Sequence, residues 1–151
     1  SKLSRRITVE SKKAGGDANA AQLRAIIEQA RKENMTRENI ERAVQKGTAS
    51  DAAALESITY ETYGPGGAAI IISTLTDSRN RTAQEIKHLL SDMGLALASP
   101  GSAAWAFEKI GESYTPKTTV ALSETDHAKL VEILEKIDAH DDVEEVFTNA
   151  E

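Results

Sequence analysis

The sequence predicts an α+β protein with a three-helix N-terminal domain over residues 1–48 and a ferredoxin-like domain over residues 49–151. Three observations predict this class. Apolar residues recur at helical spacing in the first part of the chain. Beyond residue 56 they instead alternate or form continuous runs, as in strands. From Ala68 the predicted order is β-α-β-β-α-β, behind one extra leading strand, which makes an antiparallel sheet with two helices on one face.

The N-terminal domain is predicted to contain three helices, over Ser1–Lys13, Asn19–Glu33 and Thr36–Gly47. Gly15 and Gly16 end the first helix. Thr36 is a favourable N-cap for the third helix, and Gly47 is a favourable end. Each apolar stripe is narrow and rich in alanine, so we expect the bundle to be only marginally stable alone. Residues 48–55 are predicted to be a linker or a frayed helix end.

The second domain is predicted to contain five strands and two helices. The strands are expected at Ser57–Tyr63, Ala68–Leu75, Ala103–Lys109, Lys117–Leu122 and Val143–Thr148. One helix is expected from Thr82 to Met93, with Thr82 and Glu85 at capping-box spacing, and the other after the N-cap Ser123. The Gly-Pro-Gly-Gly segment at 64–67 is predicted to be the turn between the first two strands.

Composition excludes several classes of protein and indicates one kind of partner. The chain has no cysteine, so disulfides, thiolate metal sites, iron–sulfur clusters and a cysteine nucleophile are excluded. No apolar run approaches the roughly 20 residues of a membrane-spanning helix. The net charge of −6 is uneven: residues 1–48 hold 11 Lys/Arg against 6 Asp/Glu, and residues 49–151 hold 7 against 18. A basic front end of this kind suggests a polyanionic partner.

No enzyme signature is present, and the sequence predicts neither a cofactor nor a metal. The glycine-rich turn at 64–67 is not followed by the Lys-Ser/Thr of a phosphate-binding loop. Glu85 and His88 form half of a di-metal carboxylate motif, but the other half is missing, which favours a surface pair. The His140–Asp142 segment is interpreted as a solvated turn in preference to a weak cation site. We therefore predict a non-enzymatic protein with no small-molecule substrate.

Two groups of residues are candidates for binding nucleic-acid phosphates. The first is a pair of cationic helical stripes, formed by Lys2, Arg5, Arg6, Lys12 and Lys13 and by Arg24 and Arg31. The second is the strand-to-helix turn with Arg79, Asn80 and Arg81, where arginine forks and a helix N-terminus both suit phosphate. The alternative is that the stripes are solvated faces and that Asp77 caps the helix beside solvated arginines. The basic part lacks aromatic residues, which disfavours base stacking there.

Several strings together resemble the YebC/PmpR family, which includes the mitochondrial translational activator of cytochrome c oxidase. The matching strings are Ser1-Lys2-Leu3, Gly15-Gly16-Asp17, Asn34-Met35-Thr36, Ile40-Glu41-Arg42-Ala43, Tyr60-Glu61-Thr62-Tyr63-Gly64-Pro65-Gly66-Gly67, Asp77-Ser78-Arg79-Asn80-Arg81-Thr82, Gly101-Ser102, Trp105-Ala106-Phe107, Asp141-Asp142-Val143 and Phe147-Thr148-Asn149. The resemblance covers nearly the whole chain. It implies a non-enzymatic, soluble protein of the bacterial cytoplasm, with a mitochondrial location as the alternative.

The same resemblance implies a nucleic-acid-binding regulator of gene expression. Most family members are described as DNA-binding transcriptional regulators, and some as ribosome-associated factors that assist translation by binding ribosomal RNA. The resemblance does not choose between these partners. A rival from another class is a protein-interaction adaptor that uses the acidic C-terminal face, where residues 112–151 hold 3 Lys/Arg against 11 Asp/Glu.

The sequence departs from the family pattern in two places. The family has a basic opening segment of the Gly-His-Ser-Lys-Trp kind, which would precede Ser1. It also has a further α+β domain between the strands that end near Lys109 and begin near Lys117, whereas Ile110–Pro116 bridges them directly here. Either the protein lacks that domain, or the sequence joins parts of a longer chain. If the domain is missing, so is any cleft that it forms with the ferredoxin-like domain.

Overall fold

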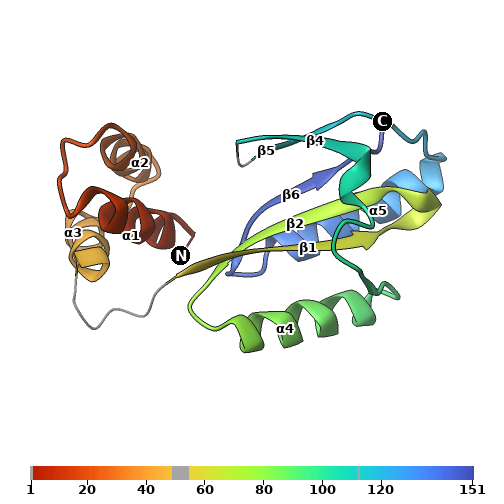
Figure 1. The fold of residues 1–151 in the computed structure, drawn as a ribbon, viewed down its shortest axis with the longest axis horizontal. Helices are drawn as coiled ribbons and strands as arrows, with labels where there is room; N and C mark the ends of the chain where they lie inside the picture. Colours follow the sequence, from red (N-terminus) through yellow and green to blue (C-terminus); the bar gives the residue numbers. More distant parts are fainter. Residues whose placement is uncertain (1, 49–54, 112) are drawn as a thin grey trace. The chain divides into compact units, whose positions relative to one another are not determined.

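The computed structural model describes residues 2–48, 55–111 and 113–151. The chain forms two compact units, Ser1–Leu55 and Glu56–Glu151, which are described separately (Figure 1). Most of the predicted linker, residues 49–54, lies outside the described residues. Within the described ranges, no helix is both long and apolar enough to cross a membrane.

The helical unit contains the three helices that the sequence predicts: α1 (Lys2–Ala14), α2 (Ala21–Lys32) and α3 (Arg37–Thr48). Gly15 and Gly16 follow α1 with positive φ angles of 62° and 82°, which stop the helix because glycine tolerates this conformation. The Thr36 hydroxyl accepts a hydrogen bond from the backbone N–H of Asn39, 3.2 Å away, as an N-cap does. The apolar core joins all three helices through Ile7, Leu23, Ile26, Ile27, Ala30, Ile40 and Ala43.

Helices α1 and α3 pack closely because α3 has a glycine where it meets α1. A Cβ atom on Gly47 would lie 2.4 Å from the backbone oxygen of Thr8 and 2.8 Å from the Cβ of Ser11. The buried Thr8 hydroxyl donates to the carbonyl oxygen of Ala43, at 3.1 Å, and the buried Ser11 hydroxyl donates to that of Val44, at 2.7 Å. Hydroxyl groups on α1 therefore bind carbonyl oxygens of the last turns of α3.

The second unit is built on a four-stranded antiparallel sheet with the strand order β3-β1-β2-β6. Its strands are β1 (Glu56–Tyr63), β2 (Ala69–Thr76), β3 (Leu97–Ala98) and β6 (Val143–Thr148). The predicted turn joins β1 to β2 through the short 3₁₀ helix η1 (Pro65–Gly67), where Gly66 and Gly67 have positive φ angles. Strand β2 is the apolar centre of the sheet, as its continuous run of apolar residues predicts.

Each face of this sheet is covered by different elements. Helices α4 (Arg79–Asp92) and α5 (Glu124–Asp138) cover one face, where Ile70 and Ile72 of β2 pack against them. On the other face, Ala69 and Ile71 pack against the 3₁₀ helix η2 (Ala104–Ala106) and strand β4 (Phe107–Ile110). Strand β4 pairs with β5 (Ser113–Pro116) in a separate two-stranded sheet. The α+β class, with a helical N-terminal region and an antiparallel sheet, is confirmed.

The strand assignment differs from the prediction in three respects. The strand predicted as an extra leading one, β1, is internal to the sheet and pairs with both β2 and β3. The strand predicted at 103–109 begins as η2 and becomes β4 only at Phe107, outside the main sheet. The strand predicted at 117–122 lies earlier in the chain, as β5 at 113–116. Within 117–122, the structure has only an isolated β-bridge between Val120 and Ala150. Residues 113–116 are therefore the return strand of a hairpin with β4, and not a plain bridge.

Helix α4 also begins earlier than predicted. Ser78 is its N-cap, and the Ser78 side chain accepts a hydrogen bond from the backbone N–H of Arg81. Thr82, predicted to cap the helix, is fully buried inside its first turns and donates a hydrogen bond to Asp142. Capping-box spacing led to the wrong position because Ser78 provides an equivalent hydroxyl four residues earlier.

Candidate nucleic-acid interface

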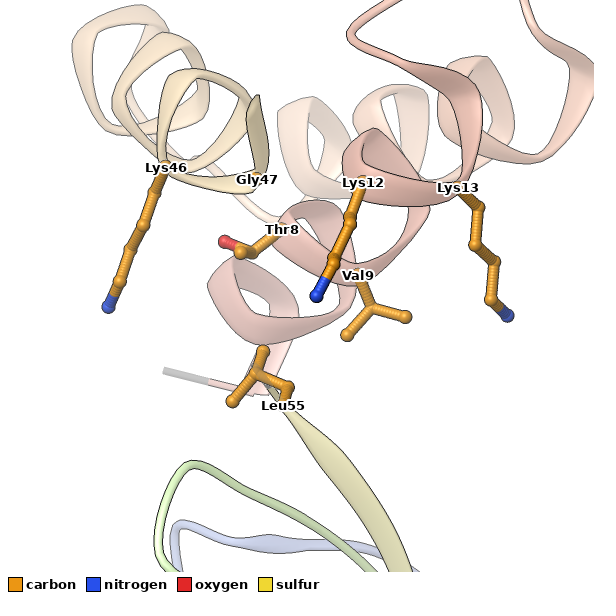
Figure 2. Close-up of a pocket in the computed structure, with 7 residues that line it drawn as sticks. All are labelled: Thr8, Val9, Lys12, Lys13, Lys46, Gly47 and Leu55. Carbon is orange, nitrogen blue, oxygen red and sulfur yellow. The ribbon is translucent and has the colours of Figure 1, made fainter. Parts of the chain in front are cut away.

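Three lysines surround a hollow at the junction of α1 and α3 (Figure 2). Lys12 and Lys13 come from the last turn of α1, and Lys46 comes from the last turn of α3. The hollow has a volume of about 300 Å³ and is also lined by Thr8, Val9, Gly47 and Leu55. In Figure 2 the three amines extend to the same side of the helix pair. The close approach at Gly47 brings the lysines of the two helices together.

These lysines differ in how far their charge is already neutralised. The Lys13 amine lies 3.5 Å from the Glu10 carboxylate, in an exposed pair of the kind that adds little stability. Lys12 and Lys46 are exposed, and neither makes an ion pair within the described ranges. All three sit at helix C-termini, where cations favourably oppose the negative end of the helix dipole. The helix dipoles therefore favour lysine at these three positions, and the charges of Lys12 and Lys46 remain available to an anion.

The other predicted residues of the helical unit do not line this hollow. Lys2 and Arg5 are partly buried, and Arg6 is exposed. Arg24 is exposed and lies 3.7 Å from Glu28, one turn along α2. Arg31 is exposed near the end of the same helix. The predicted stripe therefore contributes Lys12 and Lys13 to the hollow, while Lys46, which lies outside the predicted stripes, completes it.

The two arginines of the strand-to-helix turn differ in their pairing. Arg79 is exposed, and its guanidinium lies 3.1 Å from Glu56 at the start of β1. Asn80 is exposed in the first turn of α4. Arg81 contacts three carboxylates, with distances of 2.6 Å to Glu85, 2.9 Å to Asp142 and 3.3 Å to Asp77. The turn thus presents one arginine in a weak surface pair and one arginine that contacts three carboxylates.

Arg81 is the cation of a partly buried network. Burial alone would lower the pKa of its guanidinium, but Asp142, Asp77 and Glu85 together raise that pKa above its ordinary value. The Asp142 side chain is fully buried and also accepts a hydrogen bond from the Thr82 hydroxyl, at 2.7 Å. This network joins the start of α4 to the turn before β6. Arg81 therefore fixes the position of the turn, whereas Arg79 remains exchangeable.

Glu85, His140 and Asp142 lie close enough together for one atom of each to reach a single metal ion. The Nδ1 atom of His140 accepts a hydrogen bond from the backbone N–H of Asp142, at 3.0 Å. Its Nε2 atom, which then carries the ring proton, lies 3.2 Å from Glu85. Because both ring nitrogens are engaged and Arg81 supplies the positive charge, this cluster fits a guanidinium better than a metal. The predicted solvated turn at 140–142 is wrong for Asp142, which is buried.

The fold and the charge distribution define a two-unit α+β protein with a basic helical unit. Comparison with known proteins narrows this class to one family. A family model described as the TACO1/YebC protein N-terminal domain matches residues 1–50. A second, described as the TACO1/YebC second and third domain, matches residues 55–113. The chain belongs to the TACO1/YebC family, which confirms the resemblance seen in the sequence.

The relatives show how much of a longer family member this chain represents. One from Petrotoga mobilis, named "Probable transcriptional regulatory protein", is 41% identical over 99% of this chain and 61% of its own length. One of the same name from Fervidobacterium nodosum is 32% identical over 98% of this chain and 83% of its own length. That alignment has 209 positions, more than the 151 residues here, so the relative contains residues without a counterpart. The chain thus spans less than two thirds of the first relative.

A solved structure supports the fold of both units. It is the crystal structure of a conserved hypothetical protein, Aq1575, from Aquifex aeolicus. It is 27% identical in sequence, with a TM-score of 0.89 over 99% of this chain and 88% of its own. Its title gives no activity, and the names of the two bacterial relatives describe regulators and not enzymes.

Proposed function

We propose that this protein is a nucleic-acid-binding regulator of gene expression and that the lysine hollow of its helical unit binds the phosphate backbone. The lysine hollow comprises Lys12, Lys13 and Lys46, which project from α1 and α3 to one side. Cations grouped in this way attract phosphate without reading base sequence. The names of the relatives, which describe transcriptional regulators, agree with a nucleic-acid partner.

The observation that carries the proposal is the lack of an ion-pair partner for Lys12 and Lys46 among the described residues. Three of the other candidate cations, Arg24, Arg79 and Arg81, already lie beside a carboxylate. Binding phosphate at the hollow breaks at most the weak pair between Lys13 and Glu10. The hollow therefore gains electrostatic attraction at little cost in existing contacts.

The α+β unit contributes a second, weaker set of contacts in this proposal. Arg79 can exchange the exposed Glu56 carboxylate for a phosphate, because surface ion pairs of this kind contribute little. Asn80 lies beside it at the N-terminus of α4, where free N–H groups and the helix dipole favour anions. Arg81 acts by holding this turn in place and not by contacting phosphate.

The proposal is tested by neutralising the two lysines that lack carboxylate partners. Lys12→Gln with Lys46→Gln removes two positive charges without placing carboxylates at helix C-termini, where they would be unfavourable. Affinity for a DNA duplex and for a ribosomal RNA fragment is measured from 50 to 300 mM salt. If both lysines contact phosphate, the slope of log affinity against log salt falls by about 2. The matched control, Lys87→Gln with Lys129→Gln, removes two exposed charges from the other unit and should leave the slope unchanged.

An unchanged salt slope in the double variant would contradict this placement of the interface. A parent protein that binds neither nucleic acid but retains basic proteins after nuclease treatment would support the adaptor reading instead. If the parent protein does bind nucleic acid, the probe that it binds more tightly indicates whether DNA or ribosomal RNA is its class of target.

A further inference from the structure

We propose that Trp105 and Tyr63 form an aromatic platform on which an unpaired nucleobase stacks. This inference rests on the proposed function and deepens it, because it assigns single-stranded or looped nucleic acid as the preferred ligand. It concerns the α+β unit, where the sequence predicts phosphate contacts only at Arg79, Asn80 and Arg81.

The aromatic side chains of the platform are unusually exposed to solvent. Trp105 is the only tryptophan in the chain, and 58% of its surface is accessible. Tyr63, at the end of β1, is 36% exposed. Tryptophan side chains are highly buried on average, so an indole that stays this open suggests a binding role.

Hydrogen bonds hold the exposed indole in place. Its Nε1–H donates to the Tyr63 hydroxyl oxygen, 3.3 Å away. The Tyr63 hydroxyl in turn donates to the carbonyl oxygen of Ser102. The single polar atom of the indole is therefore satisfied within the protein, while the ring surface is left available. A ring fixed in this way loses little conformational freedom when a ligand stacks on it.

Glu61 positions the loop that presents Trp105. Its side chain is buried, with 7% of the residue exposed, and its carboxylate accepts three backbone N–H groups. These belong to Gly101 at 2.6 Å, Ala103 at 2.8 Å and Ala104 at 2.8 Å. Glu61 and Tyr63 are two residues apart on β1 and therefore lie on the same face of the sheet. One strand thus fixes both the loop and the indole ring.

The surroundings favour a nucleobase over a protein partner. The large apolar side chains exposed among the described residues are Tyr63, Trp105, Ile110 and Val131. Val131 is on α5, and Ile110 is at the tip of the β4–β5 hairpin, so no broad apolar patch surrounds Trp105. A protein interface normally needs such a patch, whereas one base needs a single aromatic face.

The local charge is also compatible with a nucleic acid. Residues 97–120 contain two lysines, Lys109 and Lys117, and two glutamates, Glu108 and Glu112. The backbone N–H of Lys117 binds the carbonyl oxygen of Ala106, which places this lysine next to the residue that follows Trp105. The acidic excess of the unit is elsewhere, with five Asp/Glu on α5 alone. Stacking at Trp105 therefore does not require an approach to the acidic helix.

The fluorescence of the full chain reports this site directly, because Trp105 is its only tryptophan. Single-stranded DNA and RNA of one sequence should quench the emission, whereas the corresponding duplex and an abasic strand of equal length should not. Trp105→Ala should weaken binding of the single strands, measured by anisotropy of a labelled strand, by roughly 10-fold. Trp105→Phe, which keeps an aromatic face, should retain most of the affinity. Glu61→Gln should reduce both the near-ultraviolet dichroism of Trp105 and the quenching.

The outcomes separate this inference from the proposed function. If labelled strands bind with full salt dependence but Trp105 emission does not change, the stacking site is wrong and the phosphate-binding proposal stands. Equal quenching by the abasic strand overturns stacking in the same way. If neither single strands nor duplex bind, the proposed function fails first. A change of Trp105 emission with oligolysine peptide alone would make the platform a protein contact and overturn the inference.

Discussion

In both units, buried polar side chains join two elements of the fold, but the chemical groups differ. In the helical unit, the neutral hydroxyls of Thr8 and Ser11 bind carbonyl oxygens of α3, and Gly47 lets the helices approach. In the α+β unit, the buried Asp142 carboxylate joins α4 to the turn before β6 through Arg81 and Thr82. The packing of α1 against α3 therefore depends on small side chains. The contact between α4 and the turn before β6 depends instead on a buried carboxylate that is paired with an arginine.

This difference also determines which cations remain available on each surface. In the helical unit the hydroxyls of Thr8 and Ser11 join α1 to α3, and Lys12 and Lys46 make no ion pair within the described residues. The α+β unit uses Arg81 as a structural cation and pairs Arg79 with Glu56. Basic residues of similar appearance in the sequence thus have different roles, because their roles depend on which carboxylates the fold places beside them.

The largest effect is expected from removing the buried charge. Asp142→Ala removes a carboxylate that contacts Arg81 and accepts from Thr82, and should lower the free energy of unfolding of the α+β unit by about 3 kcal/mol. Urea unfolding followed by Trp105 fluorescence measures this unit specifically. The adjacent Asp141 is exposed, so Asp141→Ala should change stability by less than about 0.5 kcal/mol. Equal effects of the two substitutions would show that burial of Asp142 is not important.

A smaller loss is expected from overpacking the helical unit. Gly47→Ala places a Cβ 2.4 Å from the Thr8 oxygen, so α1 and α3 must separate, at a cost of about 2 kcal/mol. Thermal loss of helical circular dichroism should begin earlier, while the urea midpoint from Trp105 fluorescence should not move. Gln45→Ala, at an exposed position of the same helix, is the control. A Gly47→Ala protein with unchanged melting would mean that the helices adjust without strain.

The smallest effect is a gain in stability. The Tyr60 hydroxyl is buried and has no hydrogen-bond partner in the parts of the chain that the structure describes. Tyr60→Phe removes this unsatisfied group and should raise the free energy of unfolding of the α+β unit by about 1 kcal/mol. The measurement is again the urea midpoint from Trp105 fluorescence, and a loss of stability would indicate that the hydroxyl has a partner.

The same residue predicts a dependence on pH. Burial raises the pKa of the Tyr60 phenol, Arg79 opposes this rise, and Asp142 adds to it. A raised pKa means that the folded state favours the neutral phenol, so its stabilising contribution is complete below the ordinary pKa of about 10 and is lost as pH rises through the folded value. Stability of the parent should therefore fall more steeply than that of Tyr60→Phe above pH 10. Parallel pH profiles would contradict the shift.

Local sequence patterns were sufficient for the elements whose stability is local. The helices around Leu23 and Leu130 were predicted because their apolar spacing indicates one buried face. The strand through Ile71 was predicted because its continuous apolar run indicates burial on both faces. The two-residue strand β3 was missed because Leu97 and Ala98 are too few to show a pattern. The internal position of β1 was also missed, since strand order depends on pairing between distant segments.

The candidate sites show the same limit. Lys12 and Lys13 were selected from their positions on one helix, but Lys46 joins them only because Gly47 allows α3 to approach α1. Trp105 was expected inside a strand, and its exposure comes from the loop that Glu61 holds. By itself the sequence determined the α+β class, the basic and acidic halves and the family. Only the tertiary structure decided that Arg79 pairs with Glu56, that Arg81 pairs with Asp142 and that the Trp105 ring is open, because these features depend on contacts between residues far apart in the chain.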